Sequence, residues 1–177
     1  MRTKHRSATI YNTTTRSRLE ARWAIFFREL NLKWIYEPIA LRGGGRSYTP
    51  DFRVQGFGYI EIKPTLELFI QESSERIASV ADANPNIKIY GFCSDHVAIR
   101  NPVLYQANKL FAPTTQHIYG LLSYARIGGD KLSVESQNVD IQRAITIANA
   151  TKFNEWQSMK SVLTDVIEDI ARQYVPA

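Results

Sequence analysis

Two acidic residues and a lysine have the types and spacing that metal-assisted chemistry needs. Side chains alternate between the two faces of a strand, so in the predicted strand 59–63 the side chains of Glu61 and Lys63 share one face. Ile60 and Ile62 then point into the core. Ten residues before Glu61 lies a second acid, Asp51.

A tight turn would bring these residues together. If the turn is centred on Gly56-Phe57, Val54 pairs with Tyr59 and Asp51 comes to lie opposite the Glu61 to Lys63 stretch. Two carboxylates then converge beside an ammonium group.

Neighbouring carboxylates repel each other unless one is protonated or a cation lies between them. Mg2+ prefers oxygen ligands and keeps several waters, so we expect Asp51, Glu61 and the carbonyl of Ile62 to hold it, with Mn2+ able to substitute. The ion would polarise a phosphoryl oxygen and activate a water. Lys63 would orient or help deprotonate that water, or neutralise charge on the phosphate. Glu20 would reach the same site directly or through a metal-bound water.

The elements that must position these residues follow from hydrophobic periodicity. The segment Ser17-Arg18-Leu19-Glu20 has the form of a capping box and opens a helix with one strongly apolar face. Short strand-like runs follow at 33–40, 47–54 and 59–63, where Pro64 ends the third strand. A helix over 66–83 and a strand over 87–93 come next. The order is helix, three strands, helix, strand, which predicts an α/β fold.

The 177 residues fit one domain. We expect a basic N-terminal arm at 1–16, a core at 17–100 and a largely helical extension at 101–177, packed on the core or forming an oligomer interface. Within the extension we expect a helix at 103–111, a hairpin across 118–134, a helix near 139–150 and a long amphipathic helix around 156–174.

Three segments, in this order and spacing, resemble the PD-(D/E)xK nuclease superfamily: Arg16 to Glu20, Tyr48 to Phe52, and Glu61 to Pro64. The likeness is greatest to small phage-type members, which include junction-resolving and homing endonucleases, and it covers about residues 15–95. It implies a restriction-endonuclease-like αβββαβ core with a mixed central sheet, to which C-terminal helices are added. It also implies that Asp51 and Glu61 bind Mg2+, that Lys63 is catalytic and that Glu20 assists metal binding.

The charge distribution points to a polyanionic partner, and we expect DNA. Residues 1–63 hold 12 Lys or Arg against five Asp or Glu, a net of +7, within a chain of net charge +5. The predicted phosphate contacts are Lys4, Arg6, Arg16, Arg18, Arg22 and Arg46. Cutting both strands of a duplex usually takes two active sites, so we expect a homodimer or a higher symmetric assembly. No apolar run reaches bilayer length and no signal-type stretch follows the N-terminus, which predicts a cytoplasmic protein of a bacterial or phage-infected cell, away from membranes.

The same residues have structural interpretations. Glu20 could cap its own helix by bonding back to the Ser17 amide, and one residue cannot easily both cap and bind metal. Asp51 could be a turn acid, and Glu61 and Lys63 could face solvent on a one-sided sheet. The run Gly43-Gly44-Gly45 is best read as a hairpin turn. Only the combined pattern favours chemistry.

The pattern therefore predicts a Mg2+-dependent DNA endonuclease that hydrolyses phosphodiester bonds with a metal-activated water. The alternative is a catalytically idle protein of the same fold that acts as a DNA-binding or recombination subunit. RNA is a third possible substrate.

Overall fold

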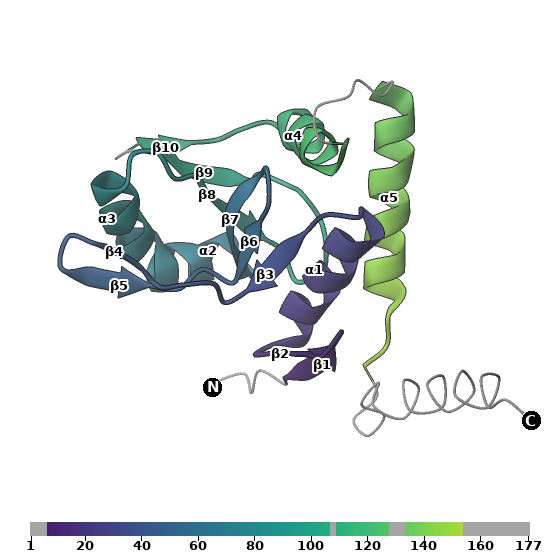
Figure 1. Cartoon of the computed structure of the whole chain (residues 1–177), viewed down its shortest axis with the longest axis horizontal. Coiled ribbons are helices and arrows are strands. Elements are labelled where there is room, and N and C mark those ends of the chain that lie inside the picture. The colour runs from purple at the N-terminus through teal and green to yellow at the C-terminus, as the bar shows by residue number, and fades with distance from the viewer. Residues whose placement is uncertain (1–6, 107–108, 128–133, 154–177) are drawn as a thin grey trace, which may run out of the picture.

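The structure is a computed structural model that describes residues 7–106, 109–127 and 134–153. Six strands form one mixed sheet, in which only β7 and β8 run parallel and the other neighbours pair antiparallel (Figure 1). Across the sheet the order is β10 (Lys109–Phe111), β9 (Val103–Gln106), β8 (Ile89–Cys93), β7 (Gly58–Lys63), β6 (Phe52–Val54) and β3 (Trp34–Tyr36).

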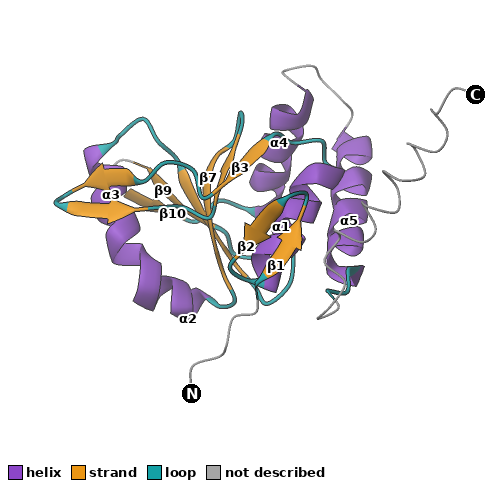
Figure 2. Cartoon of the chain, turned by 60° about the horizontal axis from the view of Figure 1, so that its bottom comes forward, coloured by secondary structure: helices purple, strands orange, loops and turns teal. Residues whose placement is uncertain are grey.

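Helices cover both faces of this sheet (Figure 2). One layer holds α1 (Arg18–Glu29), α4 (Thr115–Ile127) and α5 (Val134–Ala150). The other holds α2 (Leu66–Phe69), a π-helical stretch (Ile70–Ser74) and α3 (Glu75–Ala83), against which the hairpin of β4 (Leu41–Gly43) and β5 (Arg46–Tyr48) packs. The sheet therefore has two apolar faces, each with its own core.

The larger core is built on the apolar face of α1. Trp23, Phe26 and Phe27 are fully buried, and the Trp23 ring stacks on Phe92 of β8 with centroids 4.9 Å apart. Ser17 caps the helix, since its side chain accepts a hydrogen bond from the Glu20 amide. These contacts fix the start of α1 against the sheet.

The predicted order of helix, three strands, helix and strand is found, with a hairpin added. The predicted strand 47–54 is wrong as one element, because it divides into β5 and β6 around Thr49 to Asp51. Pro50 has no amide N–H and cannot donate to a ladder, so the pairing breaks there. The predicted turn at the three glycines is confirmed, with Gly44 and Gly45 at φ of 55° and 73°.

Two predictions in the extension are wrong. Residues 103–106 and 109–111 form a strand pair, β9 and β10, because Leu104 is buried between half-exposed neighbours and β8 offers an open edge. The region from 118 is helix α4 and not a hairpin, and the predicted helix near 139–150 is α5. The amphipathic helix predicted around 156–174 lies outside the described residues.

The N-terminal segment also differs from the expected arm. Residues 8–15 form a hairpin of β1 (Ala8–Ile10) and β2 (Thr13–Thr15) that packs on α1. Tyr11 and Asn12 make its two-residue turn, both at positive φ. Within the described ranges, no helix is long and apolar enough to cross a bilayer.

The predicted register between β6 and β7 is wrong by one residue. Val54 pairs with Gly58 and not with Tyr59, because the connection has three residues with Gly56 at φ 75°. Continued by one residue past the pair of Phe52 and Ile60, this register sets Asp51 directly opposite Glu61. The predicted meeting of the two acids therefore survives the shift.

The packing around Gly91 in β8 gives a test of this fold. A Cβ atom there would lie 2.5 Å from both Phe69 and Val103 side-chain atoms, so Gly91→Ala should lower the free energy of unfolding by about 1–3 kcal/mol. Gly120 of α4 is the matched control, because a Cβ there meets nothing within 4 Å in the described structure. Gly120→Ala should raise stability by about 0.5–1 kcal/mol. Urea denaturation measures both, and equal effects of the two changes would contradict the packing.

Candidate active site

A cavity of about 840 Å3 opens where β7 ends and β6 begins. Its walls come from the start of α1, the end of the β4–β5 hairpin, the two strand ends and the helix after β7. The ionisable side chains that line it are Arg16, Glu20, Tyr48, Asp51, Glu61, Lys63, Glu72 and Arg76. Asp51, Glu61 and Lys63, predicted from the sequence to meet, all border this one space.

Asp51 is held by main-chain contacts on both sides. Its carbonyl accepts a hydrogen bond from the Glu37 amide at 2.8 Å, which extends the β3–β6 ladder by one residue. Its Oδ2 accepts the Ile62 amide of β7 at 2.7 Å. The carboxylate is thus fixed between two strands, and only 4% of the residue is exposed.

Glu61 is equally buried and is held by side chains. The Tyr48 hydroxyl donates to Oε2 at 2.6 Å and the Ser73 hydroxyl donates to Oε1 at 2.7 Å. Burial, followed by the charges of Glu61 and Asp51, raises the pKa of Tyr48 well above its ordinary value, so the phenol keeps its proton and remains a donor. Both hydroxyls orient Glu61 without neutralising it.

Lys63 lies beside Glu61 on the same face, as predicted. Its Nζ is 3.3 Å from Glu61 Oε1 and 3.3 Å from Glu72 Oε2. Burial lowers the pKa of Lys63, but the carboxylates of Glu61 and Asp51 outweigh it and the pKa rises above its ordinary value. Lys63 is therefore an ammonium ion at neutral pH, suited to neutralise negative charge and not to accept a proton.

Glu20 borders the cavity but is engaged in capping. Its Oε1 accepts the Ser17 hydroxyl at 2.8 Å, and its Oε2 accepts the Tyr36 hydroxyl at 2.6 Å and the Arg16 amide at 3.0 Å. The return bond thus goes to the Arg16 amide and not to the Ser17 amide, which corrects the predicted capping box. Glu20 therefore fixes the start of α1 and also adds negative charge to the cavity.

Arg16 spans the mouth of the cavity. Its Nε lies 2.7 Å from Glu37 Oε1, and its Nη2 lies 3.2 Å from Asp51 Oδ1. The Arg16 side chain is 61% exposed. Arg16 therefore pairs with the outer oxygen of Asp51 from the solvent side, while Ile62 takes the inner one.

The pKa of Asp51 is raised well above its usual range. Burial is the largest cause, and the carboxylates of Glu61 and Glu20 add to it, while the Ile62 amide and Lys63 act in the opposite direction. Like charges that cannot both be solvated favour either a proton or a cation between them. The two cationic neighbours of Asp51 therefore do not offset its burial and the neighbouring carboxylates.

The cavity offers only the minimum number of carboxylate ligands that a hard cation such as Mg2+ needs. The described residues include no group of three or more His, Cys, Asp or Glu placed to hold a metal ion. Mg2+, however, is commonly held by one or two carboxylates, with water completing its shell. Asp51 and Glu61 supply that minimum. Ile62 also lines the cavity, and it contacts Asp51 through its amide N–H, whereas the sequence predicted its carbonyl as a ligand.

The predicted phosphate contacts are scattered. Arg16 lies in the cavity, whereas Arg46 on β5 pairs with Glu75 at 2.8 Å and does not line it. Arg18 and Arg22 are half-buried on α1. The pKa of Asp95, just after β8, is lowered chiefly by its hydrogen bond with His96, and the charge of Arg22 adds a smaller effect. Lys4 and Arg6 lie outside the described residues.

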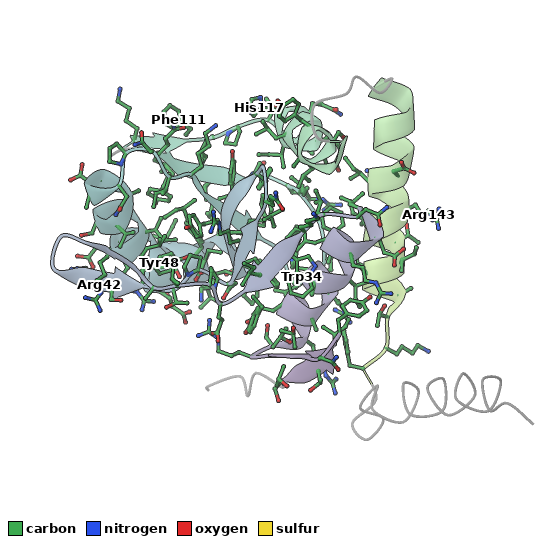
Figure 3. The ribbon with its side chains drawn as sticks, in the orientation of Figure 1. Trp34, Arg42, Tyr48, Phe111, His117 and Arg143 are labelled. Atoms are coloured by element: carbon green, nitrogen blue, oxygen red, sulfur yellow. The ribbon has the colours of Figure 1, made fainter. Side chains whose placement is uncertain are left out.

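Several site residues were not predicted. Tyr48 belongs to the segment that carries Asp51, but nothing in its spacing shows that its hydroxyl turns inward; it is drawn among interior side chains in Figure 3, whereas Arg42 of the same hairpin points outward. Ser73 and Glu72 lie in the π-helical stretch, which hydrophobic periodicity does not predict. Tyr36 shows no signal beyond its place in a strand.

Comparisons of this chain with protein-family models, with curated proteins and with solved structures found no match in any of the three.

The raised pKa of Asp51 predicts a pH-dependent stability. A carboxyl whose pKa is higher in the folded than in the unfolded state favours folding while protonated and loses that advantage as pH rises through the folded pKa. Relative to wild type, Asp51→Asn should therefore become more stable from pH 4 to pH 8, by about 1.4 kcal/mol for each unit by which the pKa is raised.

Glu75 provides the opposite case for this measurement. Arg46 lowers the pKa of Glu75, so Glu75→Gln should become less stable relative to wild type as pH rises. Urea denaturation across the pH range measures both variants. A stability difference for Asp51→Asn that stays constant with pH would contradict the assignment.

Proposed function

We propose that this chain is a Mg2+-dependent DNA endonuclease with a restriction-endonuclease-like core of the PD-(D/E)xK type. The observation that carries the proposal is the meeting of Asp51 and Glu61 from two strands, with the Lys63 ammonium beside them, at one cavity. The order α1, β3, β6, β7, α2 to α3, and β8 agrees with the αβββαβ order that the sequence resemblance implies.

In this proposal the side chains that line the cavity divide between binding the cation and stabilising the phosphate. Asp51 and Glu61 would hold the cation, and Tyr48 and Ser73 keep Glu61 turned toward it. When bound, Mg2+ supplies a Lewis acid that polarises the phosphoryl oxygen and acidifies the attacking water. Lys63, already protonated, neutralises charge that develops on the phosphate and orients the water by hydrogen bonding.

One observation favours a second candidate, a nuclease fold that binds DNA without cutting it. Both acids already face cations, since Arg16 contacts Asp51 and Lys63 contacts Glu61. A site neutralised in this way can persist without a metal ion. Binding to DNA in excess chelator, with no nicking when Mg2+ or Mn2+ is added, would favour this candidate.

Isosteric substitutions test the chemistry directly. Asp51→Asn, Glu61→Gln and Lys63→Met should each lower the rate of Mg2+-dependent cleavage of supercoiled DNA by about a hundredfold or more, because each removes a charge aimed at the reacting phosphate or its cation. Asp82→Asn and Lys109→Met are the controls, since both residues are exposed outside the cavity. Full activity of any of the three site variants, or in excess chelator, would exclude the proposal.

Metal binding can be measured without cleavage. Mg2+ at about ten times its dissociation constant should raise the free energy of unfolding of the wild type by about 1.4 kcal/mol. The gain should be lost in Asp51→Asn, which cannot offer a second negative ligand. Thermal denaturation and titration calorimetry with Mg2+ or Mn2+ report this, and an equal gain in both proteins would place the cation elsewhere.

The homodimer remains part of the proposal, because a single cavity of this kind cuts one strand. Light scattering at working concentration tests it, and a monomer that cuts both strands would contradict it.

A further inference from the structure

A second depression, of about 710 Å3, lies at the opposite end of β6 and β7 from the candidate active site. It is formed by the start of β3, the β6–β7 turn and the segment that leads into β8. Three cations line it, Lys33, Arg53 and Lys88, and none of the residues described as lining it is acidic. We call this depression, defined by those three residues, the basic groove.

Main-chain pairing brings the three cations together. The Gln55 amide donates to the Lys33 carbonyl, and the Tyr59 amide donates to the Lys88 carbonyl, both at 2.9 Å. Gly58 allows the second contact, since a Cβ atom there would lie 2.9 Å from the Lys88 carbonyl oxygen. The cations therefore come from β6 and from the residues directly before β3 and β8, and main-chain hydrogen bonds hold them at one end of these strands.

These cations are exposed and unneutralised. All three side chains are exposed, and in the described part of the chain none of them makes an ion pair. The Arg53 guanidinium lies 5.8 Å from the centre of the Tyr59 ring instead. By contrast Arg16, Arg46 and Lys63 all face carboxylates. Like charges gathered without counter-charges raise the local potential and attract a polyanion.

The groove lies on the same two strands, β6 and β7, as the candidate active site. Arg53 follows Asp51 by two residues on the same strand, and Tyr59 precedes Glu61 by two, so both pairs share the same face of the sheet about 7 Å apart. Ile35, which pairs with Arg53 on β3, is 57% exposed. Ile35 and Arg53 therefore leave this face of β3 and β6 uncovered beside the groove.

We propose that the basic groove binds the phosphodiester backbone of DNA that extends beyond the cavity, with Lys33, Arg53 and Lys88 each facing a phosphate. The inference rests on the proposed function and adds the direction in which the bound DNA extends from the active site. The acids then lie under the bond to be cut, and the cations hold the flanking nucleotides.

The test measures binding in chelator, where no cleavage occurs. The probe is a fluorescent 30-base-pair duplex, with the single strand of the same sequence as a second arm, titrated at several salt concentrations. The variant is Lys33→Ala/Arg53→Ala/Lys88→Ala. The control with the same loss of charge is Lys109→Ala/Arg143→Ala/Lys152→Ala, whose residues are exposed on other elements; Figure 3 shows Arg143 on α5, away from the sheet.

Each lost phosphate contact lowers the slope of log affinity against log salt by about 1 on a duplex and by about 0.7 on a single strand. We expect the groove variant to bind at least about tenfold more weakly at low salt, with a slope lower by about 2 to 3 on the preferred DNA, and the control to change little. Equal losses in the two variants would overturn the groove. If the two variants lost equal affinity but Asp51→Asn still abolished cleavage, the proposed endonuclease function would stand and the groove would be rejected.

A wild-type chain that shows no salt-dependent binding to either DNA would overturn the groove and the choice of DNA together. Loss of binding in the groove variant alone, in a protein that never cleaves, would keep the groove and reject the nuclease. Circular dichroism and thermal denaturation of both triple variants confirm that they are folded.

Discussion

The arrangement of the whole site depends on two buried carboxylates held face to face. Asp51 and Glu61 are each 4% exposed, and burial together with their mutual repulsion keeps the pKa of Asp51 high. Desolvated charges of this kind are held at a cost that ion pairs only partly repay, and apolar residues of similar volume often give equal or greater stability. The pair is therefore hard to explain by stability. The proposed role of the pair as two oxygen ligands for one cation explains it better.

The fold offsets that cost with donors from three separate segments, β5, β7 and the π-helical stretch. The Ile62 amide serves Asp51, the hydroxyls of Tyr48 and Ser73 serve Glu61, and Lys63 stands between Glu61 and Glu72. Ser73 and Glu72 both lie in the π-helical stretch between α2 and α3, a local irregularity that often occurs at functional sites. The scaffold around the acids is thus more elaborate than a sheet and two helices would need for packing alone.

Much of the fold around the two acids was predictable from hydrophobic periodicity and turn-forming residues. The helix after Ser17, the strand that ends before Pro64 and the meeting of Asp51 with Glu61 all follow from local pattern. The exact register did not, because Gln55, Gly56 and Phe57 can form loops of more than one length. Tyr48 and Ser73 were missed because a hydroxyl on a strand or helix carries no spacing signal, and its partner is chosen by tertiary packing.

The same limit explains the errors in the extension. Residues 103–111 are apolar enough for either a helix or a strand, and only the open edge of β8 decides in favour of a strand. Propensity is a weak prior where a long-range pairing partner is available. The core, whose partners are close in sequence, was read more accurately than the part that completes the sheet.

The two cations at the acids differ in how firmly they are held, and this difference bears on the choice between the candidate functions. The Arg16 side chain is 61% exposed and meets Asp51 from solvent, so water screens its end of the ion pair. Lys63 is 21% exposed and is fixed between two carboxylates. Arg16 can therefore leave the outer oxygen of Asp51 at small cost, whereas Lys63 remains in place. If the cations served only to neutralise Asp51 and Glu61, two buried cations would stabilise the fold more than one buried and one exposed cation. One buried lysine and one exposed arginine leave Asp51 open to a cation from solution, which is the arrangement that the proposed endonuclease requires.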